Sequence, residues 1–142
     1  MNYCLGFLTN PEATHVLLME KRRPAWQAGR LNGIGGKLEG DETGVEAMER
    51  ECLEETGLEV WGWTSMGSIA FEGGTVFVFR GVADLSLARS TTDEQVRVVK
   101  LDEAIEGLYP LVDSVQEALV ALKAELAEAH APSKSAGSIS VK

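Results

Sequence analysis

The 142-residue chain has little cysteine and few basic side chains. Its two cysteines, Cys4 and Cys52, lie far apart, so neither a disulfide framework nor a paired-cysteine metal site is expected. Only 13 lysines and arginines stand against 22 acidic residues, giving a net charge of −9. This balance argues against a nucleic acid polymer as partner, because such binding uses a basic surface. No apolar run is long enough to span a membrane, so no membrane partner is expected.

The start of the chain carries no targeting signal that we recognise. Residues Met1 to Cys4 lack the basic segment that opens a signal peptide. Together with the unpaired cysteines, this predicts a cytoplasmic location. A chain of this length is expected to form one domain with a single core. We place this domain at residues 1–130, followed by a polar tail at residues 131–142 that is poor in apolar side chains.

Apolar periodicity divides the domain into strands and helices. Continuous or alternating apolar runs predict strands, and apolar residues at helical spacing predict helices. Their order indicates an α+β (α/β) domain with a mixed sheet that is covered on both faces. The expected strands are Tyr3–Leu8, His15–Lys21, Glu59–Phe71, Thr75–Ala83 and Glu94–Lys100, the expected helices are Thr43–Thr56, Leu101–Glu106 and Asp113–Ala129, and a glycine-rich loop is expected at Leu31–Gly36.

The helix predicted at Thr43–Thr56 has clear signals at both ends. Thr43 and Glu46 have the spacing of a capping box, and Gly57 suits the left-handed position that follows a helix. Three apolar side chains fall on one face of this helix, which we assign to the core. They are Val45, Met48 and Cys52.

Three glutamates occupy another face of the same helix. Glu51 precedes Glu54 and Glu55 by three and four residues, a spacing that places them on one helix face. Like charges on adjacent turns destabilise a helix, so the cluster requires a compensating cation. Oxygen ligands without sulfur suit a hard divalent ion, Mg²⁺ or Mn²⁺. Glu51 and Glu55, one turn apart, are the leading candidates for metal ligands.

The sequence around these glutamates, GKLEGDETGVEAMERECLEETGL at residues 36–58, resembles the signature box of the Nudix hydrolases. Enzymes of this family cleave nucleoside diphosphates linked to another moiety. The resemblance implies a Nudix-type α/β/α sandwich with a mixed central sheet. The matched fixed positions are Gly36, Glu42, Arg50, Glu51, Glu54, Glu55 and Gly57, with apolar Cys52 and Leu58 at the aliphatic positions.

The resemblance also implies roles for individual residues. The carbonyl of Gly35 is expected to bind metal, and Glu54 to act as a third ligand or as the general base. Arg50 is expected to pair with Glu42 and to orient the catalytic groups. Glu94, which follows a long loop, is a candidate for a further metal ligand or base, and its alternative is an ordinary surface glutamate.

Further residues are candidates for substrate binding. Asn32 can hydrogen-bond a base through its amide, and its alternative is a role in a turn. Trp26 and Tyr109 can stack on a base, with packing in a loop or the core as the alternative. The candidates for phosphate contacts are Lys37, Arg22 and Arg23, with ordinary surface charge as the alternative.

The segment RLNGIGGK at residues 30–37 resembles the mutator-type branch of the family, which acts on nucleoside triphosphates. We therefore expect Mg²⁺-dependent hydrolysis, with Mn²⁺ as a possible substitute, of a (deoxy)nucleoside triphosphate to monophosphate and pyrophosphate. Oxidised or non-standard nucleotides are included, although Tyr109–Asp113 lacks the paired aspartates that members acting on oxidised purines can carry. The alternatives are another nucleoside diphosphate conjugate, such as a sugar, and a non-catalytic nucleotide-sensing domain. The sequence also leaves open whether the protein forms a homodimer.

Overall fold

The computed structural model describes residues 1–129. The tail predicted at residues 131–142 lies outside the described residues. All but one of the predicted strands and helices lie within two residues of their expected bounds. The strands are β1 (Asn2–Thr9), β2 (His15–Glu20), β3 (Leu31–Asn32), β4 (Ile34–Lys37), β5 (Thr64–Phe71), β6 (Gly74–Val82) and β7 (Gln95–Lys100), the helices are α1 (Gly44–Thr56), α2 (Leu101–Ile105) and α3 (Val115–Ala129), and short 3₁₀ turns occur at η1 (Ala25–Gln27) and η2 (Leu85–Leu87).

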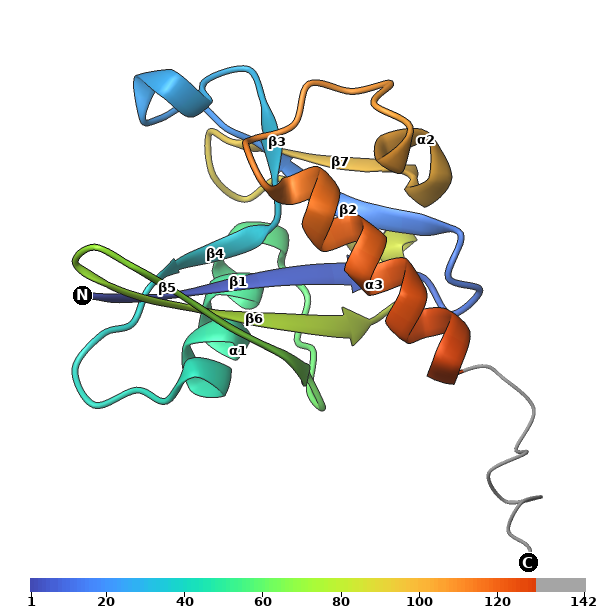
Figure 1. The fold of residues 1–142 in the computed structure, drawn as a ribbon. Helices are drawn as coiled ribbons and strands as arrows, with labels where there is room; N and C mark the ends of the chain where they lie inside the picture. Colours follow the sequence, from blue (N-terminus) through green and yellow to red (C-terminus); the bar gives the residue numbers. More distant parts are fainter. Residues whose placement is uncertain (130–142) are drawn as a thin grey trace, which may run out of the picture.

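Within residues 1–129, seven strands form one mixed sheet (Figure 1). Strands β3, β2, β1, β6 and β5 follow one another across the sheet, while β4 pairs with β1 and β7 pairs with β2. Strands β1 and β6 run parallel, and the other pairs are antiparallel. The predicted mixed sheet is therefore confirmed.

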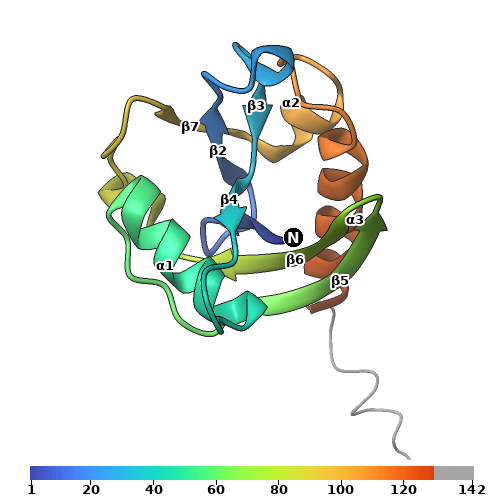
Figure 2. The ribbon, with the colours of Figure 1, turned by 90° about the vertical axis from the view of Figure 1, so that its left-hand side faces the viewer.

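Helices cover the sheet on both faces (Figure 2). The side chains of β2 alternate between the two sides, as the period of a strand requires. Leu17 and Met19 belong to the buried cluster that includes α1 side chains, and Val16 and Leu18 belong to the cluster with α2 and α3. The expected α/β/α sandwich is confirmed. Among the described residues, no helix combines the length and apolar character needed to cross a bilayer.

Helix α1 begins and ends where the sequence signals place it. Thr43 and Glu46 form the reciprocal capping box, and Gly57 adopts a left-handed φ of 76°. The prediction that Val45 belongs to the core is wrong, because this side chain is 36% exposed. The buried stripe of α1 is centred on Met48 and extends toward Ala47, so Val45 lies at its edge.

The glycine-rich segment is extended strand, where the sequence had suggested a loop. Gly35 and Gly36 pair with Leu5 and Cys4 of β1. A Cβ at position 35 would overlap the carbonyl oxygen of Cys4, so only glycine allows β4 to approach β1 this closely. In contrast, the strand expected from Glu59 begins only at Thr64, at the start of β5. The pairing of β4 places its glycines above helix α1 and so positions the candidate site.

Candidate active site

The carboxylates of Glu51 and Glu55 lie together beside β4. A Cβ at Gly36 would be 2.7 Å from the carboxylate carbon of Glu51, so the carboxylate fills the space above this glycine. Burial, a hydrogen bond that the protonated Glu55 donates to Glu51, and the negative charge of Glu51 raise the pKa of Glu55 to about 9, while the positive charge of Lys21 opposes the shift. Two adjacent carboxylates with this little solvent are costly when both are ionised.

The residues fit a hard divalent ion, because the two grouped carboxylates offer oxygen donors and their repulsion calls for positive charge. Among residues 1–129, no three His, Cys, Asp or Glu side chains converge on one metal position. Glu54 is 56% exposed and accepts a hydrogen bond from Arg50. Mg²⁺ is commonly held by one or two carboxylates together with water and substrate phosphates, and the Glu51–Glu55 pair matches that arrangement.

Arg50 connects the acidic helix to the loop before it. Its guanidinium donates two hydrogen bonds to Glu42, at 2.6 and 3.0 Å, and a third to the carbonyl of Lys37 at 3.0 Å. It also donates to Glu51 at 3.1 Å. The Glu42 hydrogen bonds raise the pKa of Arg50, and the same contact lowers the pKa of Glu42. Arg50 therefore pairs with the residue that the resemblance implied, and it holds Glu51 in place.

Glu94 is buried and faces this cluster. Its carboxylate accepts hydrogen bonds from Lys21 Nζ at 3.1 Å and from the backbone N–H of Arg22 at 2.9 Å. The loop before Glu94 is tied to α1, because the Thr91 hydroxyl donates to the carbonyl of Glu54. The surface alternative for Glu94 is wrong, since its exposed fraction is 8%. Lys21 was not predicted as a site residue, because the sequence shows it only as the polar end of a predicted strand.

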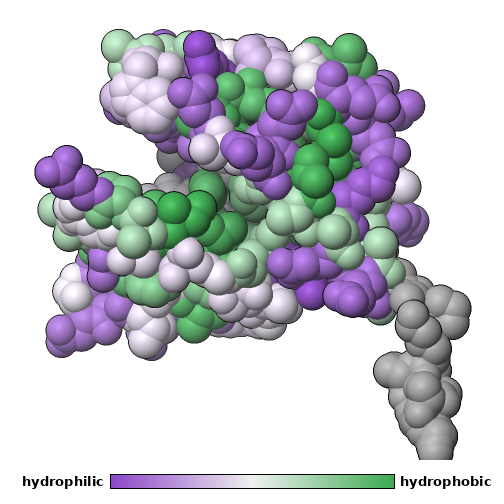
Figure 3. Space-filling model, in the orientation of Figure 1, coloured by the Kyte–Doolittle hydropathy of each residue, from purple (hydrophilic) through white to green (hydrophobic). Residues whose placement is uncertain are grey.

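A groove runs across the sheet from Gly36, the glycine beside the Glu51 carboxylate. Its first part has a volume of about 310 Å³ and is lined by Lys21, Gly35 and Gly36. A second hollow of about 310 Å³ adjoins it and is bordered by β5 and the start of α3. In Figure 3 this face of the molecule is hollowed between the upper part of the domain and the β5–β6 hairpin, with apolar side chains in the hollow. Leu5, Gln27 and Asn32 line both parts.

The structure brings only some of the substrate candidates to this groove. Asn32 lines both of its parts, and Trp26, which is 59% exposed, lines the second. Arg23 is held away by a two-bond ion pair with Asp93. Tyr109 does not line either part, and its hydroxyl donates to Glu103. Arg22 and Lys37 have exposed side chains that line neither part.

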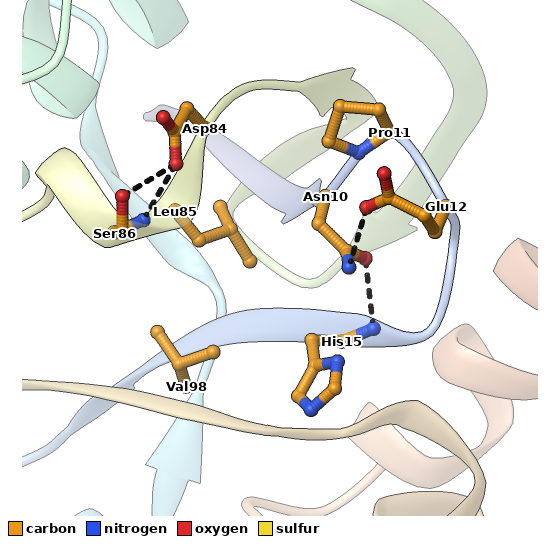
Figure 4. A pocket seen from close by; sticks show the side chains of 8 residues that line it. All are labelled: Asn10, Pro11, Glu12, His15, Asp84, Leu85, Ser86 and Val98. Carbon is orange, nitrogen blue, oxygen red and sulfur yellow. Dashed lines mark hydrogen bonds between the residues drawn. The ribbon is translucent and has the colours of Figure 1, made fainter.

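A wider hollow of about 590 Å³ lies between the β1–β2 turn and η2 (Figure 4). Its polar groups bond one another: Asn10 contacts Glu12 and the backbone of His15, and Asp84 accepts from Ser86. None of the predicted site residues lines it. The groove that extends from Gly36 toward α3 is therefore the better candidate for the active site.

The sheet between two helical layers, with paired carboxylates beside a glycine-containing strand, defines an α/β domain of the Nudix type. The model of the NUDIX domain matches residues 4–126, and the chain belongs to this family. Nudix hydrolases generally use divalent metals. Homologous proteins of this family bind small nucleotide substrates.

Two similar proteins are named oxidized purine nucleoside triphosphate hydrolase. The mouse protein is 43% identical over 49% of this chain and 43% of its own length, and the Danio rerio protein is 47% identical over 40% of this chain and 36% of its own length. The chain thus matches less than half of the length of each relative. Among solved structures, a MutT protein from Methanosarcina mazei Go1 is 25% identical with a TM-score of 0.69, covering 89% of this chain and 94% of the other.

Proposed function

We propose that the chain hydrolyses a (deoxy)nucleoside triphosphate to nucleoside monophosphate and pyrophosphate with the help of Mg²⁺, for which Mn²⁺ can substitute. The observation that carries the proposal is the Glu51–Glu55 pair beside Gly36, at one end of a groove whose other end contains an amide and apolar side chains. The name of the two similar proteins, oxidized purine nucleoside triphosphate hydrolase, supports a nucleoside triphosphate as substrate, with oxidised purines included.

In this proposal the end of the groove beside Gly36 would bind the metal ion. Glu51 and Glu55 would hold the divalent ion, with the Gly35 carbonyl, Glu54 and Glu94 as further candidate ligands. When bound, the ion would neutralise phosphate charge and acidify water. Arg50 keeps Glu51 at its position through the hydrogen bonds described above.

Other residues of the chain would assist the reaction at the phosphates. Glu94 and Glu54 are the candidates for a general base, because each has a carboxylate near the paired glutamates. Lys21 lines the groove beside β4, where its charge would favour the phosphate groups. The substrate base would occupy the second hollow, next to Asn32 and Trp26.

The test compares Glu51→Gln and Glu55→Gln with the unchanged protein, using a panel of triphosphates with added Mg²⁺. We expect either change to lower turnover by about 100-fold or more, since each removes a charged ligand. Glu49→Gln is the matched control, because Glu49 lies on the same helix and makes no side-chain hydrogen bond with the described residues. Unchanged metal-dependent turnover in both variants would contradict the ligand assignment.

The products separate this proposal from its alternatives. Pyrophosphate with a nucleoside monophosphate supports triphosphate hydrolysis. A sugar phosphate with a monophosphate, formed from a nucleoside diphosphate sugar, would instead identify a conjugate hydrolase. Nucleotide binding without any hydrolysis in excess Mg²⁺ would identify a sensing domain. The chain retains all three box carboxylates, Glu51, Glu54 and Glu55, which supports catalysis over sensing.

A further inference from the structure

Gln27 lies at the junction of the two parts of the groove. It lines both hollows, together with Asn32 and Leu5, and it belongs to the turn η1. Backbone hydrogen bonds hold this turn against the end of β2: Gly29 N–H donates to the Lys21 carbonyl, and Arg30 N–H donates to the Gln27 carbonyl. The side chain of Gln27 is therefore presented to the groove by an anchored segment.

The hydrogen bonds around Asn32 fix the orientation of its amide. The backbone N–H of Gly33 donates to Asn32 Oδ1 at 2.7 Å, and only the oxygen of an amide can accept this bond. Asn32 Nδ2 must then face the other way, where it donates to Gln27 Oε1 at 3.4 Å. The orientation of the Gln27 amide follows in turn, with its oxygen toward Asn32 and its nitrogen directed away.

The two amides consequently offer mainly donors to a ligand. Gln27 Nε2 makes no hydrogen bond with any residue in the range 1–129, and Asn32 Nδ2 keeps a second hydrogen. The other polar groups of the second hollow distinguish less strongly between donor and acceptor groups of a ligand. Ser68 and Ser114 carry hydroxyls that can donate or accept, and the Asp113 carboxylate is 85% exposed and faces Arg30.

We infer that Gln27 is a specificity-determining residue that, with Asn32, selects bases carrying a carbonyl oxygen over bases carrying an amino group at the same position. This inference rests on the proposed function, because it places the base of the substrate in the second hollow. An amide nitrogen donates to a carbonyl oxygen, whereas two amino donors facing each other leave both groups without a partner. A site built around a hydrogen bond rejects a ligand that cannot make it.

The experiment uses dITP and dATP, whose bases carry a carbonyl oxygen and an amino group, respectively, at C6. We expect the unchanged protein to have a higher kcat/KM for dITP. Gln27→Glu keeps an oxygen for Asn32 and removes the donor, so the preference for dITP should fall by roughly fivefold to tenfold, the value of one hydrogen bond. Gln27→Met, which removes both polar atoms, should lower the same ratio.

Ala28→Glu is the control for charge, because it adds a carboxylate to the same exposed turn at a position that lines neither part of the groove. It should leave the dITP to dATP ratio within twofold. Loss of activity on both substrates in equal proportion, with the ratio unchanged in both Gln27 variants, would overturn the inference. A merely structural role of Gln27 predicts that result, because misfolding does not distinguish the two bases.

Binding measurements keep the inference separate from the proposed function. If the unchanged protein hydrolyses no triphosphate, the proposed function fails, and the dissociation constants of dIMP and dAMP are compared by calorimetry. A preference for dIMP that falls in Gln27→Glu and remains in Ala28→Glu supports the role of Gln27. Equal affinities of the unchanged protein for dIMP and dAMP would overturn it.

Discussion

The carboxylate of Glu51 occupies the space that a side chain at Gly36 would need. Glu51 belongs to helix α1 and Gly36 to strand β4, so this contact joins the acidic helix to the glycine strand. It explains in physical terms why glycine stands at position 36. The backbone there does not require a left-handed φ, and the restriction comes from the neighbouring carboxylate.

Gly36→Ala should displace Glu51 without unfolding the chain. The new methyl group would meet the carboxylate of Glu51, which is the flexible end of a side chain. We expect Mg²⁺ affinity to fall roughly 10- to 100-fold, as is typical when the support of a metal ligand is disturbed. Isothermal titration calorimetry measures the affinity, and Val45→Ala on the exposed edge of α1 is the control. An unchanged affinity in Gly36→Ala would show that Glu51 does not bind the ion at this position.

The pKa of Glu55 predicts how stability depends on pH in metal-free buffer. Folding raises the pKa of this carboxyl from the usual 4.5 to about 9, so the folded state favours its protonated form. The contribution of Glu55 to folding stability is fully present below pH 4.5 and is lost as the pH rises toward 9. The melting temperature in EDTA should therefore decline from pH 5 to pH 9, and Glu55→Gln should make the decline shallower. Calorimetric scans that give identical slopes for both proteins would refute this prediction.

Arg50→Lys keeps the positive charge but removes the planar fork that binds Glu42 through two hydrogen bonds. We expect turnover to fall roughly 10- to 100-fold and the melting temperature to decrease, because Glu51 and the loop at Lys37 lose a common partner. The matched control is Arg97→Lys, which changes an exposed ion pair with Glu20. Equal effects of the two substitutions would contradict a special role of Arg50.

Lys21→Met should destabilise the metal-free protein at pH 8, because it leaves the buried carboxylate of Glu94 without its charged partner. We expect the melting temperature to fall by roughly 4–8 °C, a cost reduced by the remaining hydrogen bond from the Arg22 backbone. Added Mg²⁺ should restore part of this loss. The comparison is with Lys100→Met, a change at an exposed lysine, which should have little effect.

Several features were predictable because their causes are local in sequence. Thr43, Glu46 and Gly57 determine the ends of α1 through hydrogen bonds and backbone angles within a few residues. The spacing of Glu51 and Glu55 places them on one helix face wherever the helix lies. The failure at Val45 has a different origin. Helical spacing defines a stripe, but only the position of the helix against the sheet decides which edge of that stripe is buried.

The sequence by itself determined the acidic helix, its caps, the order of the strands and the chemistry that three clustered glutamates allow. Only the tertiary structure decided that Glu94 is buried with Lys21, that Tyr109 lies outside the groove and that Gln27 meets Asn32. These contacts depend on strand pairing and on the path of loops across the sheet. The amide pair is the clearest case: its residues lie five positions apart, yet its orientation follows from a turn anchored to β2 and from the backbone of Gly33.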